Sequence, residues 1–163
     1  MSGKAVTADE IIAILGMQPH PEGGYYVETY RHQPDDGGRG VKTGIFYLLR
    51  SGDRSHWHRV DAVEMWHWHA GCALELSIST DGRTVERHIL GMGLAGGQRP
   101  QAVVPLNAWQ SARPLPASEA DPAPGTTAGN ETADWVLVGC TVSPNFEFSG
   151  FEMAPPDWQP GRS

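Results

Sequence analysis

The stretch "SHWHRVDAVEMWHWHAG", Ser55–Gly71, holds four of the chain's seven histidines and three of its six tryptophans. Its first part, "SHWHRV", reads as a β-strand, which places His56 and His58 on one face because side chains alternate along a strand. A turn at 59–62 follows, and "AVEMWHWHA" reads as a second strand. One face of this second strand carries Glu64, Trp66 and Trp68, and the opposite face carries Met65, His67 and His69.

The two strands predict that His56, His58 and Glu64 meet on one wall. Two imidazoles and a carboxylate are a common ligand set for a divalent metal. The same groups can instead hydrogen-bond one another and pack, and the residues alone leave both interpretations open. We expect His67 and His69, on the opposite face, to be partly exposed or to lie in an interface.

The remainder of the chain predicts a β-rich fold with one short helix. Thr7 and Glu10 form a capping box before the apolar run "IIAIL", and Gly16 supplies a stop, so a helix is expected there. About eight to ten short strands follow, separated by turns rich in glycine and proline. Many short strands at this spacing favour a barrel or a sandwich.

Composition excludes several classes of protein. The net charge is −7, whereas a nucleic-acid partner requires clustered Lys and Arg. We see no apolar run of about 18 residues and no apolar signal core, so neither a membrane span nor export is expected. The two cysteines, Cys72 and Cys140, lie far apart, which fits a reduced compartment. We therefore expect a cytoplasmic protein.

The expected domain organisation is one domain over residues 1–154 with a tail over 155–163. Residues 115–134 are rich in Ala, Pro, Gly and Thr and carry almost no large apolar residue. Such a composition predicts a long exposed loop inserted between two strands.

Five residues resemble the first cupin motif, in which a glycine precedes His-x-His and a glutamate precedes a closing glycine: Gly52, His56, His58, Glu64 and Gly71. With "EGGYYVETYR", "EMWHWHAG", "GGQRPQAVVPLNAWQSAR" and "LVGCTVSPNFEFSGFEMA", the chain resembles the DUF985 family, or Cupin_5, of the RmlC-like cupins. The resemblance implies an all-β double-stranded β-helix, or jelly-roll barrel, with a ligand pocket in its mouth. That family was defined without a known function.

The second cupin motif departs from the pattern of metal-binding cupins. In "VPLNAWQ", Asn107 stands in place of the glycine and Gln110 in place of the histidine. A carboxamide oxygen is a poorer donor than an imidazole to zinc, iron or nickel. We therefore expect no metal cofactor. The alternative is a site for Fe, Mn, Ni or Zn held by His56, His58, Glu64 and Gln110.

The stretch "EGGYYVETYR" predicts a strand whose one face carries Tyr26, Glu28 and Tyr30. Two interpretations stay open: these side chains contact a ligand, or the tyrosines cover a sheet while Glu28 pairs with Arg31. In RmlC-like cupins an N-terminal strand joins the sheet of a partner subunit, so the resemblance implies a homodimer.

The resemblance also implies a function, because sugar epimerases of the superfamily use a histidine base and a tyrosine acid. Here His58 is the expected base, with Glu64 orienting it and Tyr26 or Tyr30 donating a proton. We expect Glu28, His58 and Glu64 to form the reactive wall. Trp66, Trp68 and Trp109 would supply flat walls for a sugar or base ring, with Gln101 and Gln110 as polar ligand contacts.

Three functions therefore remain open from the sequence. The first is a metal-independent epimerase or isomerase that binds a polar, sugar- or nucleotide-like molecule. The second is a metal-dependent oxygenase or isomerase. The third is a small-molecule binding module without turnover.

Overall fold

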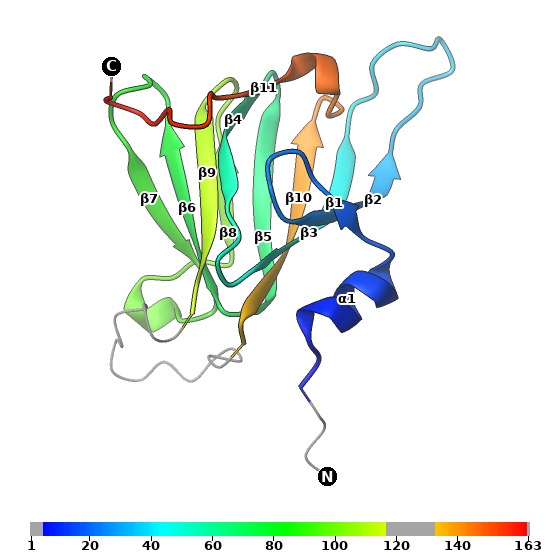
Figure 1. Ribbon diagram of the computed structural model, residues 1–163. Helices are drawn as coiled ribbons and strands as arrows, with labels where there is room; N and C mark the ends of the chain where they lie inside the picture. The colour runs from blue at the N-terminus through cyan, green and yellow to red at the C-terminus, as the bar shows by residue number, and fades with distance from the viewer. Residues whose placement is uncertain (1–4, 117–132, 163) are drawn as a thin grey trace.

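The computed structural model describes residues 5–116 and 133–162, and its strands form two antiparallel sheets that face each other as a barrel (Figure 1). The first sheet has the order β1 (Gln18–Pro19), β2 (Tyr25–Arg31), β3 (Thr43–Arg50), β10 (Trp135–Ser143), β5 (Val63–Gly71) and β8 (Gln101–Val104). The second has the order β11 (Phe151–Met153), β4 (Ser55–Val60), β9 (Trp109–Leu115), β6 (Ala73–Ser79) and β7 (Glu86–Leu90). Two 3-10 turns, η1 (Leu94–Gly96) and η2 (Phe148–Gly150), lie in the connections. The predicted all-β jelly-roll barrel is confirmed.

The helix α1 (Ala8–Leu15) forms as its sequence predicts. Thr7 Oγ1 accepts a hydrogen bond from the Glu10 backbone N–H, and the Glu10 carboxylate accepts one from the Thr7 N–H. Gly16, with φ of 65°, ends the helix in the left-handed conformation. The apolar face of α1 packs on the outside of the first sheet against Leu48 and Trp135. No helix in the described part of the chain is long and apolar enough to cross a membrane.

The space between the sheets is apolar at one end and polar at the other. Along β10, all four alternate residues from Val136 to Val142 are buried, and the last two, Cys140 and Val142, also line a cavity. The strand β5 runs antiparallel beside it, so Glu64, paired with Val142, lies at the cavity end. Side-chain alternation along β10 and along β5 as far as Trp68, where the pairing of the two strands shifts register, thus brings polar groups to one end of the barrel.

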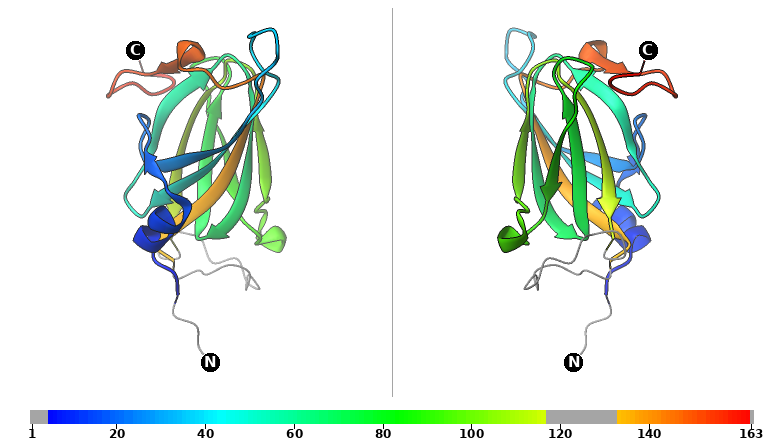
Figure 2. Two further views of the ribbon diagram at one scale, coloured as in Figure 1. Left: turned by 90° about the vertical axis from the view of Figure 1, so that its right-hand side faces the viewer. Right: turned by 90° about the vertical axis from the view of Figure 1, so that its left-hand side faces the viewer.

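The C-terminal segment 154–162 packs on the second sheet, at the end of the barrel opposite α1 (Figure 2). The Trp158 ring lies 4.5 Å from the Trp109 ring and 6.1 Å from the Trp57 ring, centroid to centroid. Aromatic pairs at these distances stabilise the contact beyond simple area burial. The expected tail is therefore attached to the barrel through Trp158.

The expected inserted loop, 115–134, falls mostly outside the described residues. Leu115 is the last residue of β9, and Trp135 is the first residue of β10. Residues 117–132 lie outside the part of the chain that the structure describes.

Candidate active site

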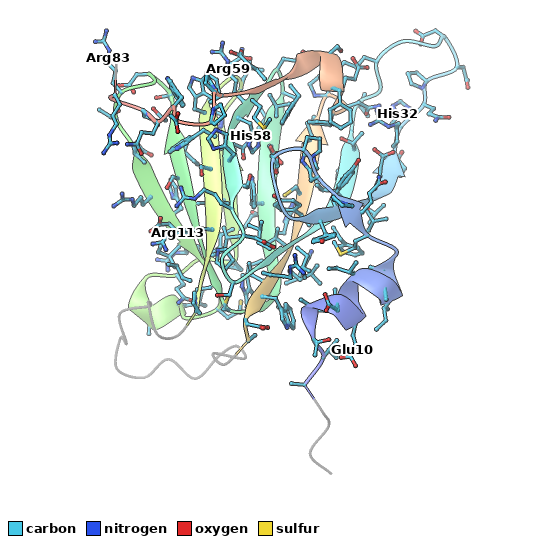
Figure 3. The ribbon with its side chains drawn as sticks, in the orientation of Figure 1. Glu10, His32, His58, Arg59, Arg83 and Arg113 are labelled. Carbon is cyan, nitrogen blue, oxygen red and sulfur yellow. The ribbon has the colours of Figure 1, made fainter. Side chains whose placement is uncertain are left out.

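A cavity of about 70 Å³ lies between the sheets at the polar end of the barrel. Since one water molecule needs about 10–15 Å³ of such volume, the cavity suits a small ligand. Its apolar wall comes from Ile45, Val60, Val142, Phe146 and Phe148. Its polar wall comes from His20, Glu22, Tyr26, Glu28, Arg31, Thr43, His58, Glu64 and Cys140. Figure 3 shows His58 between the two sheets, in the upper half of the barrel as drawn.

Glu22 and His58 form a buried pair at the base of this cavity. His58 Nε2 lies 3.1 Å from Glu22 Oε2, and the two side chains are 2% and 8% exposed. The other ring nitrogen, Nδ1, lies 2.7 Å from the His56 carbonyl oxygen. A carbonyl oxygen only accepts, so Nδ1 carries a hydrogen, and Nε2 of the neutral ring is the acceptor. Glu22 Oε2 and His58 Nε2 therefore share one proton.

The protonation of this pair follows from its burial. Burial raises the pKa of Glu22 from 4.5 to about 8, although a hydrogen bond from Ser55 Oγ to Glu22 Oε1 (3.1 Å) opposes the shift. Burial also lowers the pKa of His58, with the nearby Glu64 opposing that shift. Both effects favour neutral groups, so near neutral pH the shared proton resides mainly on Glu22.

Glu64 is positioned by a chain of two hydrogen bonds from Trp66 and Gln110. The Trp66 indole N–H donates to Gln110 Oε1 at 2.8 Å, and since that N–H only donates, the orientation of the Gln110 amide is fixed. Gln110 Nε2 then donates to Glu64 Oε2 at 2.6 Å. Glu64 Oε2 is thus an acceptor, and a proton on this carboxyl group resides on Oε1.

Glu64 titrates near neutral pH. Burial raises its pKa from 4.5 to about 7; the neighbouring His58 and the Gln110 hydrogen bond oppose the shift, and Glu22 reinforces it. His20 also contacts Glu22: its Nδ1 accepts from the Glu22 N–H at 3.2 Å and lies 3.6 Å from Glu22 Oε2. Burial lowers the pKa of His20 to about 4, with His58 contributing in the same direction. The cavity thus contains two carboxyl groups that titrate around neutrality beside neutral imidazoles.

The wall formed by β2 differs from the predicted one. Tyr26 and Glu28 line the cavity as expected, but Arg31 takes the place of Tyr30, which is 55% exposed. The pairing of β2 with β3 shifts register between Glu28 and Tyr30. One extra residue reverses the faces that follow it, so the prediction for Tyr30 is wrong. Glu28 pairs with Arg31, which was the alternative interpretation of this strand.

His56 does not join His58 and Glu64, so the predicted three-residue wall is wrong at this position. The pairing of β4 with β9 shifts register between Ser55 and His58, which breaks the expected alternation. The His56 ring Nε2 instead lies 3.2 Å from the Ala154 carbonyl oxygen and 3.0 Å from that of Pro155. His56 is thus a contact of the C-terminal segment.

Two of the three tryptophans that were predicted to line the pocket lie in the barrel core instead. Trp66 is 1% exposed, and Trp68 packs against the same core while its indole N–H donates to the Cys72 carbonyl oxygen at 2.9 Å. Both lie on the face of β5 that was predicted, but farther along the barrel than Glu64. Neither lines the cavity.

Trp109 and Gln101 lie on outer surfaces. Trp109 precedes the buried Gln110 on β9, and adjacent residues of a strand point to opposite faces. Its ring contacts Trp158 and lies 4.7 Å beneath the Arg59 guanidinium. Gln101 pairs with His67 across β8 and β5 and lies 3.1 Å from its ring Nδ1. The predictions of ligand contact for both are wrong in this structure.

The residues of the alternative metal-site prediction do not converge. His56 contacts two backbone carbonyls, and both amide atoms of Gln110 are already bonded, to Trp66 and Glu64. Within residues 5–116 and 133–162, no group of three or more His, Cys, Asp or Glu side chains is arranged to hold a metal ion. The set His56, His58, Glu64 and Gln110 therefore does not fit a metal in this geometry.

Glu22 and His20 lie in the connection between β1 and β2 and were not predicted as site residues. A loop has no side-chain periodicity, so no pattern placed these residues beside His58. The available signal was "EGG", because a glycine pair marks a place where the backbone passes close to another chain segment. Gly23 has φ of 113°, and a Cβ there would collide with the Arg54 carbonyl oxygen. The buried Tyr47 hydroxyl donates to the Gly23 carbonyl oxygen.

Gly23→Ala is expected to lower the free energy of unfolding by about 2–4 kcal/mol, because it combines an unfavourable φ with a backbone collision. Gly37→Ala is the matched control, since Gly37 also has positive φ (72°) but open space around its Cβ position. Urea unfolding of both variants separates the two effects. Equal losses in both would show that the close approach of Gly23 to Arg54 contributes nothing.

An antiparallel double-stranded β-helix with a polar cavity between its sheets defines a cupin-fold protein. The chain belongs to the family described as Cupin_5, Cupin superfamily (DUF985), whose model matches residues 9–154. A comparison with curated proteins finds no match.

Solved structures extend this assignment. A protein from Shewanella oneidensis is 34% identical, with a TM-score of 0.77 over 92% of this chain and 85% of that one. A hypothetical protein from Leishmania major is 30% identical, with a TM-score of 0.72 over 91% and 88% of the two chains. An oxalate decarboxylase variant from Bacillus subtilis is 12% identical, with a TM-score of 0.57 over 83% of this chain and 29% of that one. At that identity the likeness concerns the fold alone.

Proposed function

We propose that the cavity binds a small, polar, carbonyl-bearing molecule of the sugar-like class and moves protons on it without a metal, as an epimerase or isomerase. The observation that carries the proposal is the buried Glu22–His58 contact of 3.1 Å in the same cavity as Glu64. Proton abstraction beside a carbonyl needs a base at carbon and an acid at oxygen, each with a pKa near the working pH. Glu64 and the Glu22–His58 pair have those properties.

In this proposal Glu64 is the base. Its ionised carboxylate takes the proton from the carbon next to the carbonyl, and the electrons of that C–H bond form the double bond of an enediol. The carbonyl oxygen takes the proton that Glu22 and His58 share. Return of a proton to the opposite face of the same carbon gives the epimer, and return to the neighbouring carbon gives the isomer. His58 becomes part of the acid because its Nε2 faces Glu22.

Other cavity residues would orient the substrate. The Tyr26 hydroxyl accepts from Gln18 Nε2 at 3.2 Å, which leaves its own O–H free to donate to a ligand. Phe146 and Phe148 lie with ring centroids 5.1 Å apart and provide an apolar surface on the same wall. A few polar groups on a mostly apolar surface are typical of small-molecule sites.

The test is solvent isotope exchange. The protein is incubated in D2O with a panel of aldoses and ketoses, with and without a chelator, and proton NMR follows the C–H signals next to the carbonyl. Loss of such a signal at a rate that the chelator leaves unchanged supports the proposal. Saturable binding without exchange would make the protein a binding module. Exchange that stops with chelator and returns with Fe, Mn, Ni or Zn would make it a metal-dependent isomerase.

We also propose that the protein is a homodimer. The outer face of the first sheet exposes Val63 (40%) and Val103 (51%) on neighbouring strands, and apolar side chains grouped on a sheet face favour association. Light scattering is expected to give twice the 17.7 kDa mass of the chain. A mass of one chain over a wide concentration range would contradict the dimer.

A further inference from the structure

We propose that Glu28 determines the specificity of the cavity: by holding Arg31, it makes the site reject anionic molecules, so the ligand is an uncharged polar compound. The inference rests on the cavity of the proposed function and names the charge class of its ligand. It concerns binding alone and is tested without turnover.

The Arg31 guanidinium is already engaged on one side. Its Nε donates to Glu28 Oε1 at 3.1 Å, and its Nη2 donates to Glu28 Oε2 at 2.9 Å. Nη2 also donates to the Phe146 carbonyl oxygen at 2.9 Å. A two-point contact between a guanidinium and a carboxylate is the geometry that an anionic ligand would otherwise use. Glu28 therefore occupies the position of a ligand carboxylate.

The charges of the cavity wall leave no other attraction for an anion. Arg31 is the only Arg or Lys among the described lining residues, whereas three carboxyl groups line the same cavity, those of Glu22, Glu28 and Glu64. The imidazoles of His20 and His58 each present an acceptor nitrogen toward Glu22. A ligand carboxylate would lie beside the Glu28 carboxylate, and beside Glu64 once that group ionises, while Arg31 is already paired, which is unfavourable.

A cation is not favoured either at slightly acidic pH. The raised pKa values of Glu22, about 8, and Glu64, about 7, keep these buried carboxyl groups mostly neutral there. An ammonium ligand would have to ionise a buried acid before it gained an ion pair. An uncharged molecule with hydroxyl or carbonyl groups can hydrogen-bond to these neutral groups and leaves the Glu28–Arg31 ion pair intact.

Glu28→Gln is the informative substitution, because the glutamine side chain has nearly the same shape and its oxygen still accepts from Arg31. The second Arg31 contact is lost, and the guanidinium charge is no longer balanced. Glu75→Gln is the matched control: Glu75 also pairs with an arginine, Arg113, at 3.1 Å, but outside the cavity. Both variants change the net charge of the protein by the same amount.

The probes are three compounds with one three-carbon skeleton: glycerol (neutral), glycerate (anion) and 3-amino-1,2-propanediol (cation). Their dissociation constants are measured by NMR titration of 15N-labelled protein at low salt and about pH 6, where both buried carboxyl groups are largely protonated. The amide spectra also report whether each variant keeps the fold.

In the wild-type protein and in Glu75→Gln, glycerol is expected to bind about tenfold or more tightly than glycerate, because the Glu28 carboxylate repels an anion and already pairs with Arg31. In Glu28→Gln, the glycerate affinity is expected to rise about tenfold, with glycerol nearly unchanged. The double variant Glu28→Gln/Arg31→Gln is expected to lose that gain.

Four results would overturn the inference: equal binding of glycerate and glycerol by the wild type, no gain for glycerate in a folded Glu28→Gln, tightest binding of the cation, or no binding of any probe. Failure of the proposed function is a different result. If the selectivity is found but no sugar shows isotope exchange, the proton-transfer proposal is wrong and the charge selectivity stands.

Discussion

Glu64→Gln is expected to lower the rate of substrate C–H exchange with solvent by about 10²–10⁴-fold, the usual contribution of a general base. The glutamine oxygen can still accept from Gln110 Nε2, as Glu64 Oε2 does at 2.6 Å, so the geometry of the wall is kept. The substitution removes only the ability to take a proton. The measurement is the NMR exchange rate at about pH 7.5, where the Glu64 carboxyl, with its pKa of about 7, is largely ionised.

The pH dependence provides an independent check of the same assignment. In the wild-type protein, the rate is expected to rise as Glu64 ionises near its pKa of about 7, and to fall as the Glu22–His58 pair loses its proton near the Glu22 pKa of about 8. Glu75→Gln, outside the cavity, is the control and should keep the wild-type rate. A Glu64→Gln rate close to that of the wild type would place the base elsewhere.

The second large effect is on stability at alkaline pH. Glu22 and Glu64 have folded-state pKa values of about 8 and 7, both above the ordinary value of 4.5. As the pH rises above 4.5, these groups lose their protons in the unfolded chain while the folded protein keeps them. The unfolded state then binds fewer protons, so the free energy of unfolding falls with rising pH until the folded-state groups also ionise.

Glu22→Gln and Glu64→Gln are therefore each expected to be more stable than the wild type at about pH 9, by on the order of 3–5 kcal/mol, and to differ little from it at about pH 4.5. Glutamine resembles the protonated acid and cannot ionise. Urea unfolding at the two pH values measures the difference, with Glu75→Gln as the control. If neither cavity variant gains stability at alkaline pH, the buried carboxyl groups are not held neutral by the fold.

Two buried histidines lower the free energy of unfolding at acidic pH. His20, with a folded-state pKa of about 4, and His58, whose pKa is also lowered, are held neutral by burial. As the pH falls below 6.5, the unfolded chain takes up protons that the folded protein does not, so stability is lost toward acid. The opposing contributions of the carboxyl groups and the imidazoles favour maximal stability at mildly acidic pH.

The sequence predicted side-chain direction correctly where strands are regular. The face of β5 that carries Glu64 and Trp66 points inward as alternation requires, and both are buried. Gln110 was predicted to contact a ligand, but the structure buries it between Trp66 and Glu64, behind the cavity wall rather than among its lining residues. Strand spacing predicted a barrel or a sandwich, and the family resemblance implied the jelly-roll fold; the fold and the family are both confirmed.

Two residues were misplaced by irregular strand pairing. The register of β4 shifts between Ser55 and His58, and that of β2 shifts between Glu28 and Tyr30. A side-chain period of two cannot reveal an extra residue, so His56 and Tyr30 were assigned to the wrong face. A third error, Trp109, was avoidable, because it adjoins the inward-facing Gln110.

Glu22 could not be placed from local pattern. It reaches the cavity only because the connection between β1 and β2 passes beside β4, where the Glu22 carbonyl oxygen accepts from the His56 N–H at 2.8 Å. The contact spans more than 30 residues of sequence, and nothing in a loop's composition specifies such a partner. The raised pKa of Glu22 depends on its burial. Because the position of Glu22 could not be predicted from the sequence, its raised pKa could not be predicted either.

A carbon-13 NMR titration of the glutamate side-chain carboxyl groups measures both pKa values, with Glu22→Gln and Glu64→Gln used to assign the two signals. We expect both groups to titrate near neutrality, Glu64 at about 7 and Glu22 at about 8. Such values would establish a cavity that holds a base and a protonated acid at the same pH. Titration of both groups near the ordinary glutamate value of 4.5 would contradict it, because neither the acid nor the base of the proposed reaction would then have the required protonation state.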